Sequence, residues 1–423
     1  MIRPSALLIA LALVVSGQAA GWSSFRSDPL NTGNAPFDPG EGIVPLWEHR
    51  ADSAVTSSVV ADEGIVVYGT KDGAIDCLNA KNGTFLWNRS TGSKVQSTPC
   101  IDGDNDIVVY CNDLGEIGAL KADDGTPVWV NDPIGVQIIS SPKVVDGRIY
   151  VGTYGSEFLC LHLSNGSIIW RYTGCKSWVH TTPSIWQGKV YFGSCDGTMN
   201  CVDAIDGTLI WTFTAEFIPS SPSVMGGRIY FGAYDSTFYC LNATTGKKVF
   251  GTALGDDIYS SPAVGASGVF VGCDDGSLYA LDPYNGNVLW TNASSGGTLQ
   301  SSPALAGGLV AFCDREGLKL VKSDDGGPVA AFRYGDASDS SPAVHDGMMI
   351  WGDNLGYVRA IGPKTPIGDG DPGGNDALTL MLLALAGTNM VFFAIVLIVL
   401  RLLRKKYNRS RRLRLEQEFQ GGR

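Results

Sequence analysis

The sequence predicts an all-β protein: an eight-bladed β-propeller closed by its own N-terminal strand and followed by one C-terminal transmembrane helix. A Ser/Thr pair recurs eight times along the chain, at intervals of 39 to 43 residues. The 423 residues include 54 Gly and only 17% charged residues, which is typical of tight turns and short strands. A run of 24 uncharged, mostly apolar residues near the C-terminus is long enough to cross a bilayer.

Residues 1–20 are predicted to be a signal peptide. Arg3 gives a short positive start, residues 6–15 form an apolar core of ten residues, and small residues follow at Gly17, Ala19 and Ala20. Secretory signals share this arrangement, and the apolar core is too short to span a bilayer comfortably. We therefore expect cleavage near residues 19–21 and export of the mature N-terminus.

The repeat aligns on the Ser/Thr pair. Pro comes directly after the pair in the last seven copies, and the string SSPAV occurs twice. The eight pairs are Ser57-Ser58, Ser97-Thr98, Ser140-Ser141, Thr181-Thr182, Ser220-Ser221, Ser260-Ser261, Ser301-Ser302 and Ser340-Ser341. A fixed period of this size is typical of repeat architectures such as solenoids and propellers.

Each copy carries the same order of strand and turn signals. Short apolar runs alternate with turns such as Asp146-Gly147 and Asn285-Gly286, and the last run ends on an aromatic residue, usually Trp. Asn-Gly and Asp-Gly supply the positive φ angles of tight hairpins, so each copy predicts a four-stranded antiparallel blade. The strand-end Trp should fill the space between neighbouring blades. Because Pro is tolerated at a sheet edge, the Ser/Thr pair should open the innermost strand.

The two ends of the repeat complement each other. The last pair, Ser340-Ser341, precedes the strand signals 348–352 and 356–362, but no strand that ends on Trp comes after them. A strand of that kind, 42–47, precedes the first pair. The N-terminal strand should therefore complete the last blade, and we expect the propeller to span residues 21–361.

The C-terminal part should leave the propeller and enter a membrane. Residues 362–376 are rich in Pro, Gly and Asp and predict a stalk, 377–400 predict the transmembrane helix, and 401–423 form a basic tail. Clusters of Lys and Arg stay on the cytoplasmic side. The propeller should thus lie outside a plasma or cell membrane, in a single-pass protein.

Charge excludes one class of function. The chain carries 31 basic and 42 acidic residues, of which the tail holds nine basic and two acidic ones. Without the tail and Arg3, the exported part has a net charge near −19. A surface this acidic does not bind nucleic acid through phosphate groups.

These repeats resemble the pyrroloquinoline-quinone (PQQ) repeat family. Residues 275–290, DGSLYALDPYNGNVLW, are similar to that family's repeat consensus, and 22–33, WSSFRSDPLNTG, look like the segment that precedes many of its propellers. The family includes quinone-dependent alcohol dehydrogenases with calcium. It also includes propellers that bind no cofactor, such as the scaffold subunit of the bacterial outer-membrane β-barrel assembly machinery.

Two features separate the chain from the dehydrogenases of that family. Those enzymes carry an adjacent Cys-Cys disulfide near the quinone, whereas no two of the ten Cys here are adjacent. The even repeat intervals also leave no room for the long insertions that cover the pocket of those enzymes. We therefore expect no catalytic residues and no cofactor. The alternative is a dehydrogenase that uses PQQ and calcium.

Candidate binding residues come from the position before each Ser/Thr pair, which should lie at one mouth of the central channel. His180 and Asp339 lie four blades apart there, too far for a catalytic pair. The alternative is that these positions are ordinary solvated loop residues. The candidates for a ligand-facing rim, with Trp178 added as a neighbour, are Gln96, Trp178, His180, Tyr259, Gln300 and Asp339.

Four of the ten Cys occupy one column of the repeat, where other blades have Ala. They are Cys77, Cys160, Cys201 and Cys240. Exchange with Ala indicates a small buried side chain rather than a ligand. Cys100 and Cys111 flank one hairpin turn, and export would permit a disulfide, but the sequence does not fix any pairing.

Two short motifs add weaker candidates. Asp102, Asp104 and Asp106 have the alternating acids of a calcium loop, although Ile107 replaces the required Gly and an extended hairpin turn would explain the same residues. Five N-x-S/T motifs on the exported side would permit glycosylation. They begin at Asn82, Asn88, Asn165, Asn242 and Asn292.

Together these features predict a non-catalytic propeller, tethered to the membrane, that binds a protein or glycan partner as a scaffold. Two alternatives remain open. One is the PQQ- and calcium-dependent dehydrogenase, and the other is a structural component of a cell-surface layer.

Overall fold

The computed structural model describes residues 21–35, 42–293, 297–334 and 340–364. These ranges lie in one compact unit, Met1–Ile367, and contain strands and turns but no helix, so no membrane-spanning helix occurs within them. A second unit, Gly368–Arg423, falls wholly outside them. The predicted signal peptide, transmembrane segment 377–400 and tail 401–423 therefore lie outside the described residues, as does the stalk beyond residue 364.

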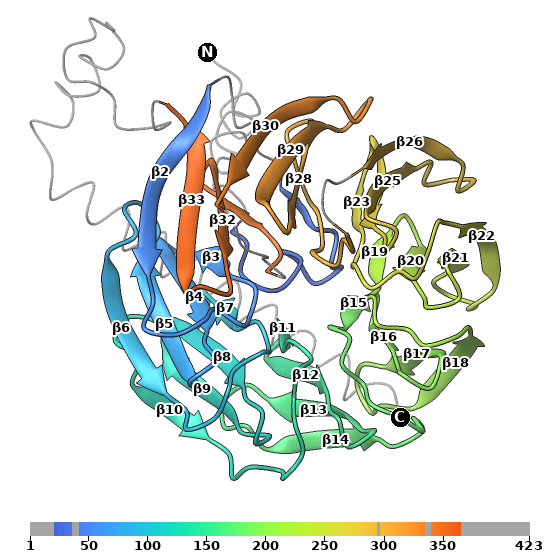
Figure 1. Cartoon of the computed structure of the whole chain (residues 1–423). Coiled ribbons are helices and arrows are strands. Elements are labelled where there is room, and N and C mark those ends of the chain that lie inside the picture. The colour runs from blue at the N-terminus through green and yellow to red at the C-terminus, as the bar shows by residue number, and fades with distance from the viewer. Residues whose placement is uncertain (1–20, 36–41, 294–296, 335–339, 365–423) are drawn as a thin grey trace, which may run out of the picture. The chain divides into compact units, whose positions relative to one another are not determined.

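The strands form eight sheets that are arranged as the blades of a ring, as the sequence predicts (Figure 1). Each blade has four antiparallel strands that lie side by side from the ring axis outward, and blade 7 gains a fifth, parallel strand at its inner edge. The first four blades are β3 (Val60–Asp62), β4 (Ile65–Gly69), β5 (Ala74–Asn79) and β6 (Phe85–Ser90); β7 (Cys100–Asp102), β8 (Ile107–Cys111), β9 (Ile117–Lys121) and β10 (Pro127–Val130); β11 (Lys143–Val145), β12 (Arg148–Gly152), β13 (Phe158–His162) and β14 (Ile168–Tyr172); and β15 (Ser184–Trp186), β16 (Lys189–Gly193), β17 (Thr198–Asp203) and β18 (Leu209–Thr214).

The remaining four blades repeat this order. They are β19 (Ser223–Met225), β20 (Arg228–Gly232), β21 (Thr237–Asn242) and β22 (Lys248–Ala253); β23 (Ala263–Gly265), β24 (Gly268–Gly272), β25 (Ser277–Leu281) and β26 (Val288–Ala293); β27 (Ala304–Ala306), β28 (Leu309–Asp314), β29 (Gly317–Lys322) and β30 (Pro328–Arg333); and β31 (Ala343–His345), β32 (Met348–Gly352), β33 (Tyr357–Pro363) and β2 (Ile43–Arg50). The Asp146-Gly147 turn has the predicted geometry, since both residues have positive φ, whereas in the Asn285-Gly286 turn only Gly286 does.

The N-terminal strand closes the ring, which confirms the prediction. β2 pairs antiparallel with β33, from Ile43 opposite Pro363 to Arg50 opposite Tyr357, and becomes the outer strand of blade 8. Figure 1 shows these two strands, from opposite ends of the propeller, side by side.

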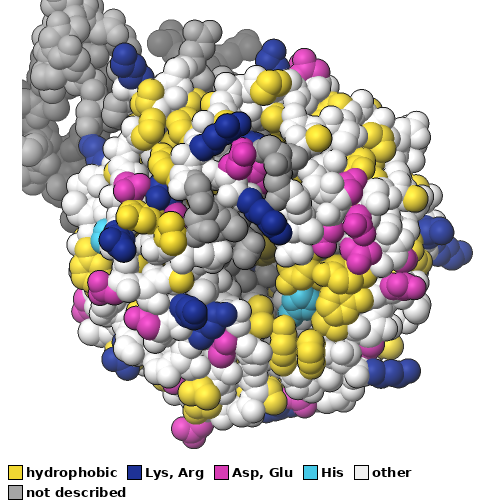
Figure 2. Space-filling model, in the orientation of Figure 1, with side chains coloured by type: hydrophobic (Ala, Val, Ile, Leu, Met, Phe, Trp, Pro, Cys, Tyr) yellow, Lys and Arg dark blue, Asp and Glu magenta, His cyan; other side chains and the backbone are white. Residues whose placement is uncertain are grey.

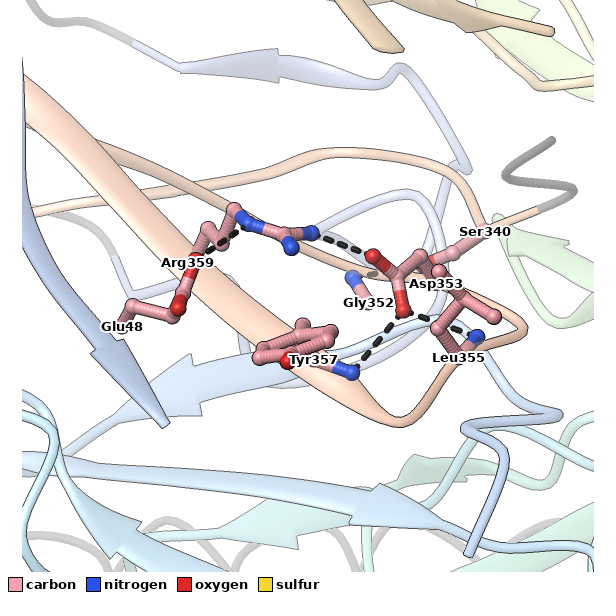
Figure 3. A network of polar contacts seen from close by, with 7 residues as sticks. All are labelled: Glu48, Ser340, Gly352, Asp353, Leu355, Tyr357 and Arg359. Atoms are coloured by element: carbon pink, nitrogen blue, oxygen red, sulfur yellow. Dashed lines mark hydrogen bonds and ion pairs between the residues drawn. The ribbon is translucent and has the colours of Figure 1, made fainter. Parts of the chain in front are cut away.

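A partly buried network of charged side chains stabilises this closure (Figure 3). Arg359 of β33 donates hydrogen bonds to Glu48 of β2 (2.7 Å) and to Asp353, which lies in the turn before β33. The other carboxylate oxygen of Asp353 accepts the backbone N–H groups of Leu355 (3.0 Å) and Tyr357 (2.8 Å). One guanidinium thus connects the strand from the start of the propeller to the turn near its end.

The recurring Ser/Thr pair builds the inner wall of the ring. The first hydroxyl accepts a backbone N–H at the end of the second strand, as between Gly69 and Ser57 (2.8 Å). The second residue links blades, because its backbone N–H donates to the second hydroxyl of the next pair. These bonds run from Ser58 to Thr98, Thr98 to Ser141, Thr182 to Ser221, Ser221 to Ser261, Ser261 to Ser302, Ser302 to Ser341, and Ser341 back to Ser58.

The outer-strand Trp residues link blades at the periphery, as predicted. Trp87 Nε1 donates to the carbonyl of Ala122 in the next blade (2.9 Å), and Trp290 bonds Ser323 in the same way (3.0 Å). The Gly of the neighbouring turn packs on the Trp ring. A Cβ on Gly125, whose φ is +68°, would lie 2.5 Å from the ring of Trp87.

Residues 22–35, here called the axial segment, touch the inner strands of blades 1 to 7 in order. A stretch of 14 residues can do this only near the ring axis, because it spans at most ~50 Å when extended. Trp22 pairs with Ala61, and β1 (Asn34–Ala35) adds to blade 7 by pairing parallel with β27. The carbonyls of Ser23, Pro29, Leu30, Thr32 and Gly33 accept N–H groups from Ile101, Ile185, Val224, Val264 and Leu305.

Polar side chains fix the axial segment in place. Lys143 Nζ donates to Ser24 Oγ (2.9 Å) and to the Phe25 and Asp28 carbonyls (2.8 Å each). Asn31 Nδ2 donates to the carbonyl of Pro183 (3.1 Å). The resemblance identified this motif, and the structure gives its residues a role in filling the axis.

None of the ten Cys, all of which lie within the described ranges, forms a disulfide, so Cys100 and Cys111 are not bonded to each other. The Cys column of the repeat is buried as expected. Cys77, Cys160, Cys201 and Cys240 have 0% exposure.

Candidate functional site

One end of the ring carries the short segments that lead into the inner strands. In the segments of blades 1 to 7 a buried aliphatic residue stands two positions before the Ser/Thr pair, as with Val95, Val179 and Ile258. The residues on either side of it are at least partly exposed, as with Trp178 and His180 around Val179, except for the buried Pro219 in blade 5. This alternation places one or two residues of each of these segments on the rim.

A second set of rim residues comes after the second strand of each blade. Their backbone N–H groups donate to the carbonyl three positions before the pair. In blades 3 to 6 these donors and acceptors are Tyr154 and Gln137 (2.9 Å), Cys195 and Trp178 (2.8 Å), Tyr234 and Phe217 (3.0 Å), and Asp274 and Asp257 (2.9 Å). The rim therefore has a fixed backbone and side chains that differ from blade to blade.

Aromatic rings gather on the rim over blades 3 to 6. We call the set of Tyr154, Trp178, His180, Phe217, Tyr234 and Tyr259 the aromatic sector. Figure 2 shows hydrophobic side chains gathered beside a His near the centre of the ring, with Asp and Glu side chains close by.

The rings of the aromatic sector contact one another in a chain. Tyr154 and Trp178 stack with centroids 4.7 Å apart and an angle of 3° between the ring planes, and Trp178 is 50% exposed. Phe217 and Tyr234 lie 4.7 Å apart. His180 stands between the groups, 6.0 Å from Phe217 and 5.9 Å from Tyr259. The stacked Tyr154–Trp178 pair thus offers a flat aromatic surface to solvent.

His180 is neutral in this setting. Burial lowers the pKa of His180 to about 4, because the charged imidazolium loses its hydration. Its Nε2 atom is buried and has no hydrogen-bond partner among the described residues. At neutral pH the side chain is therefore an uncharged ring with one buried acceptor or donor atom.

Four carboxylates adjoin the aromatic sector in blade 6, and we call Asp256, Asp257, Asp274 and Asp275 the acidic sector. Burial raises the pKa of Asp274, the other three carboxylates raise it further, and a hydrogen bond from Gln300 Nε2 (3.3 Å) opposes the shift. The Asp274 Oδ1 atom is buried without a hydrogen-bond partner in the described part of the chain.

The acidic sector helps to raise the pKa of a tyrosine in the aromatic sector. Burial, followed by the carboxylate of Asp274, raises the pKa of Tyr234 to about 12. No Lys or Arg in the described ranges forms an ion pair with the acidic sector.

The structure brings together three of the six candidates from the sequence, namely Trp178, His180 and Tyr259. Gln300 reaches the same region through Asp274. Gln96 lies in blade 2, where it accepts a hydrogen bond from Lys94 Nζ (2.7 Å) and donates to the Asp113 carboxylate (2.9 and 3.1 Å). Asp339 lies outside the described residues.

Seven residues of the two sectors were not predicted from the sequence. Phe217 and Asp257 stand three positions before their Ser/Thr pairs, on the far side of the buried aliphatic residue, and Asp256 precedes Asp257. Tyr154, Tyr234 and Asp274 stand two positions after the residue that ends the second strand, and Asp275 follows Asp274. The signal that could have found them is the alternation around the aliphatic residue, together with the recurring turn that joins the second and third strands.

No group of three or more His, Cys, Asp and Glu side chains within the described ranges could hold a metal ion. The suggested calcium loop is the hairpin turn between β7 and β8. There the Asp102 carboxylate accepts the N–H of Asp104 (3.1 Å) and Asn105 Nδ2 (2.8 Å), and Asp106 takes a positive φ. These contacts are those of a turn.

The five glycosylation motifs differ in access. Asn82, Asn88, Asn165 and Asn242 are exposed. Asn292 is only partly exposed, and its Nδ2 donates to the carbonyl of Gly326 (2.9 Å). Glycosylation of the exposed four stays a prediction.

Solved propellers share this fold. BamB from Moraxella catarrhalis aligns with a TM-score of 0.67 and 19% identity, covering 76% of this chain and 98% of that one. The quinohemoprotein alcohol dehydrogenase ADHIIG from Pseudomonas putida HK5 aligns with a TM-score of 0.68 and 12% identity, covering 88% of this chain and 86% of that one. At such identities the likeness concerns the fold alone.

Curated relatives match only locally. A quinoprotein ethanol dehydrogenase from Pseudomonas putida is 41% identical over 64 residues, which is 15% of this chain and 10% of the relative. The match thus spans a tenth of that protein's length.

A family model agrees with the repeat pattern, the closed ring and these likenesses. The model described as outer membrane protein assembly factor BamB matches residues 37–141, 113–222 and 196–331, which is more than half of the chain. The chain therefore belongs to this family of PQQ-repeat propellers.

Proposed function

We propose that the chain is a non-catalytic scaffold, tethered to a membrane by residues 377–400, whose propeller binds a protein partner outside that membrane. The observation that carries this proposal is the aromatic sector. Six rings from four blades converge at one end of the ring, and Trp178 is half exposed. Exposed clusters of large aromatic side chains are typical of protein interfaces.

The family supports the same function. Its model is described as an outer membrane protein assembly factor, a role that depends on binding other proteins. The membrane tether in this chain comes from the sequence, where 24 uncharged residues precede a basic tail.

Site-specific photocrosslinking tests the proposal. A photoreactive phenylalanine derivative replaces Trp178 in the full chain, in its native membrane. Tyr284, which is 70% exposed beside Arg228, is replaced in the same way as the control. We expect a discrete protein adduct at position 178 and none at 284. The absence of an adduct at position 178 would contradict the proposal. An adduct that glycosidases remove would indicate a glycan partner instead, and a ladder of adducts between copies of the chain would indicate a surface layer.

A PQQ-dependent dehydrogenase is the second candidate, because the local identity to a quinoprotein ethanol dehydrogenase reaches 41%. The scaffold is favoured over this candidate because no group of three or more His, Cys, Asp and Glu side chains within the described ranges could hold a calcium ion. Titration of the purified chain with PQQ and calcium decides this point. A saturable rise in melting temperature with dye-linked alcohol oxidation would favour the dehydrogenase.

A further inference from the structure

Resting on the proposed function, we propose that the aromatic and acidic sectors together receive an arginine side chain from an extended segment of the protein partner. The stacked Tyr154–Trp178 pair would hold the face of the guanidinium, and the negative charge of the Asp274 and Asp257 carboxylates on the same rim would attract it. This proposal adds the chemistry of the partner to the proposed function.

The stacked rings present a flat surface that suits a guanidinium. Tyr154 and Trp178 are nearly parallel, at 3°, and Trp178 leaves half of its surface exposed. Trp gives the strongest cation–π attraction of the aromatic side chains, and the planar guanidinium stacks on such rings better than an ammonium does. None of the cation–π contacts in the described part of the chain involves Tyr154, Trp178, Phe217 or Tyr234.

The charge beside the rings favours a cation. The acidic sector concentrates four carboxylates, and Asp274 keeps a buried oxygen without a partner among the described residues. A buried acceptor without a hydrogen bond is costly, so a donor from a ligand would be stabilised there. A neutral glycan could also stack on Trp178, but it would not relieve the repulsion among these carboxylates.

The same propeller already uses this combination of groups once. In blade 8 the Arg359 guanidinium lies 4.0 Å from the ring centroid of Tyr334 and 4.5 Å from that of Tyr357, and it donates to Asp353 and Glu48. Rings and carboxylates together hold that arginine. The rim has the rings and the carboxylates, and no Lys or Arg of the described ranges forms an ion pair with the acidic sector or a cation–π contact with Tyr154 or Trp178.

Peptide binding to the purified full chain in detergent tests the proposal. The probe is a short fluorescent peptide of Gly and Ser with spaced Arg residues. The matched peptide carries citrulline, which keeps the shape of arginine without its charge, and a third probe is a neutral maltooligosaccharide. The variants are Trp178→Ala and Asp274→Asn, with Tyr284→Ala as an exposed aromatic control and Asp123→Asn as an exposed acidic control.

We expect the Arg peptide to bind and the citrulline peptide to bind at least about tenfold more weakly. Trp178→Ala and Asp274→Asn should each weaken Arg-peptide binding about fivefold to tenfold, and Asp274→Asn should also reduce its salt dependence. The two control variants should bind like the unmodified chain.

Equal binding of both peptides, equal effects of target and control variants, or saccharide binding that Trp178→Ala abolishes would each overturn the proposal. Failure of this proposal can be distinguished from failure of the proposed function. A protein adduct at position 178 without preference for arginine would leave the scaffold standing and remove only the arginine site.

Discussion

Replacing Arg359 with Met should destabilise the closed ring more than any other change to the network in Figure 3. Arg359 and Asp353 have side-chain exposures of 6% and 3%, so their ion pair is buried. The Met side chain preserves much of the packing volume but leaves the Asp353 carboxylate buried without a cation. The Glu48 side chain, in contrast, is 49% exposed and can be hydrated by solvent.

The magnitude can be worked out from these exposures. Removing one partner of a buried ion pair costs roughly 3–5 kcal/mol of the free energy of unfolding, because the remaining charge is uncompensated. Removing the exposed partner costs about 0–1 kcal/mol, so Glu48→Gln should be mild. Asp353→Asn added to Arg359→Met removes the orphaned charge but keeps an oxygen for the N–H groups of Leu355 and Tyr357. The double variant should recover about 1–3 kcal/mol of the loss.

Urea unfolding of the purified chain, followed by Trp fluorescence, measures these differences as shifts of the midpoint at constant slope. Two results would refute the reasoning. One is an Arg359→Met loss no larger than that of Glu48→Gln. The other is a double variant that is no more stable than the single one.

Three further changes should have measurable effects on stability. Ser261→Ala removes the acceptor of the Ser221 N–H and should cost about 1–3 kcal/mol in urea unfolding, whereas the exposed Ser267→Ala should be neutral. Trp87→Phe removes one hydrogen bond between blades and should cost about 1–2 kcal/mol, and an unchanged thermal midpoint would contradict that role. Burial raises the pKa of Asp76 to about 6, so the folded state binds more protons than the unfolded state. Stability should therefore fall by about 3 kcal/mol in total as pH rises from well below 4 to well above 6. Asp76→Asn should flatten this profile, and an equally steep profile in that variant would assign the pH dependence to other groups.

The fold was predictable because its signals are local and repeated. The Ser/Thr pair, the Asp-Gly turns and the strand-end Trp each appear several times, so one irregular copy does not obscure the period. Closure was predictable because a surplus strand at one end matches a missing strand at the other. The contacts of the axial segment were not predictable. Residues 22–33 have no periodic pattern, and their backbone carbonyls accept hydrogen bonds from many different blades.

The site was predictable only in part. The position of the Ser/Thr pair was enough to find Trp178, His180 and Tyr259, because equivalent positions of the repeat lie at the same height along the ring axis. Tyr154 and Tyr234 stand in a column far from the Ser/Thr pair in sequence, and a hairpin brings them to the rim. The stacking of Tyr154 on Trp178 depends on the angle between neighbouring blades, and the period of the repeat does not determine that angle.

The attachment of β2 to β33 also sets the order in which the protein can fold. Each blade from 1 to 7 is built from hairpins that are local in sequence, and such hairpins form within microseconds. Glu48, however, meets Arg359 across 311 positions, and Arg26 meets Pro303 across 277. Contacts of such long range form slowly because a large loop must close first.

Until residue 363 has been synthesised, β2 has no partner and blade 8 has an open edge. Unpaired strand edges associate readily with other chains. The greatest risk of aggregation therefore falls late in biosynthesis, after seven blades are complete and while β2 still lacks its partner strand.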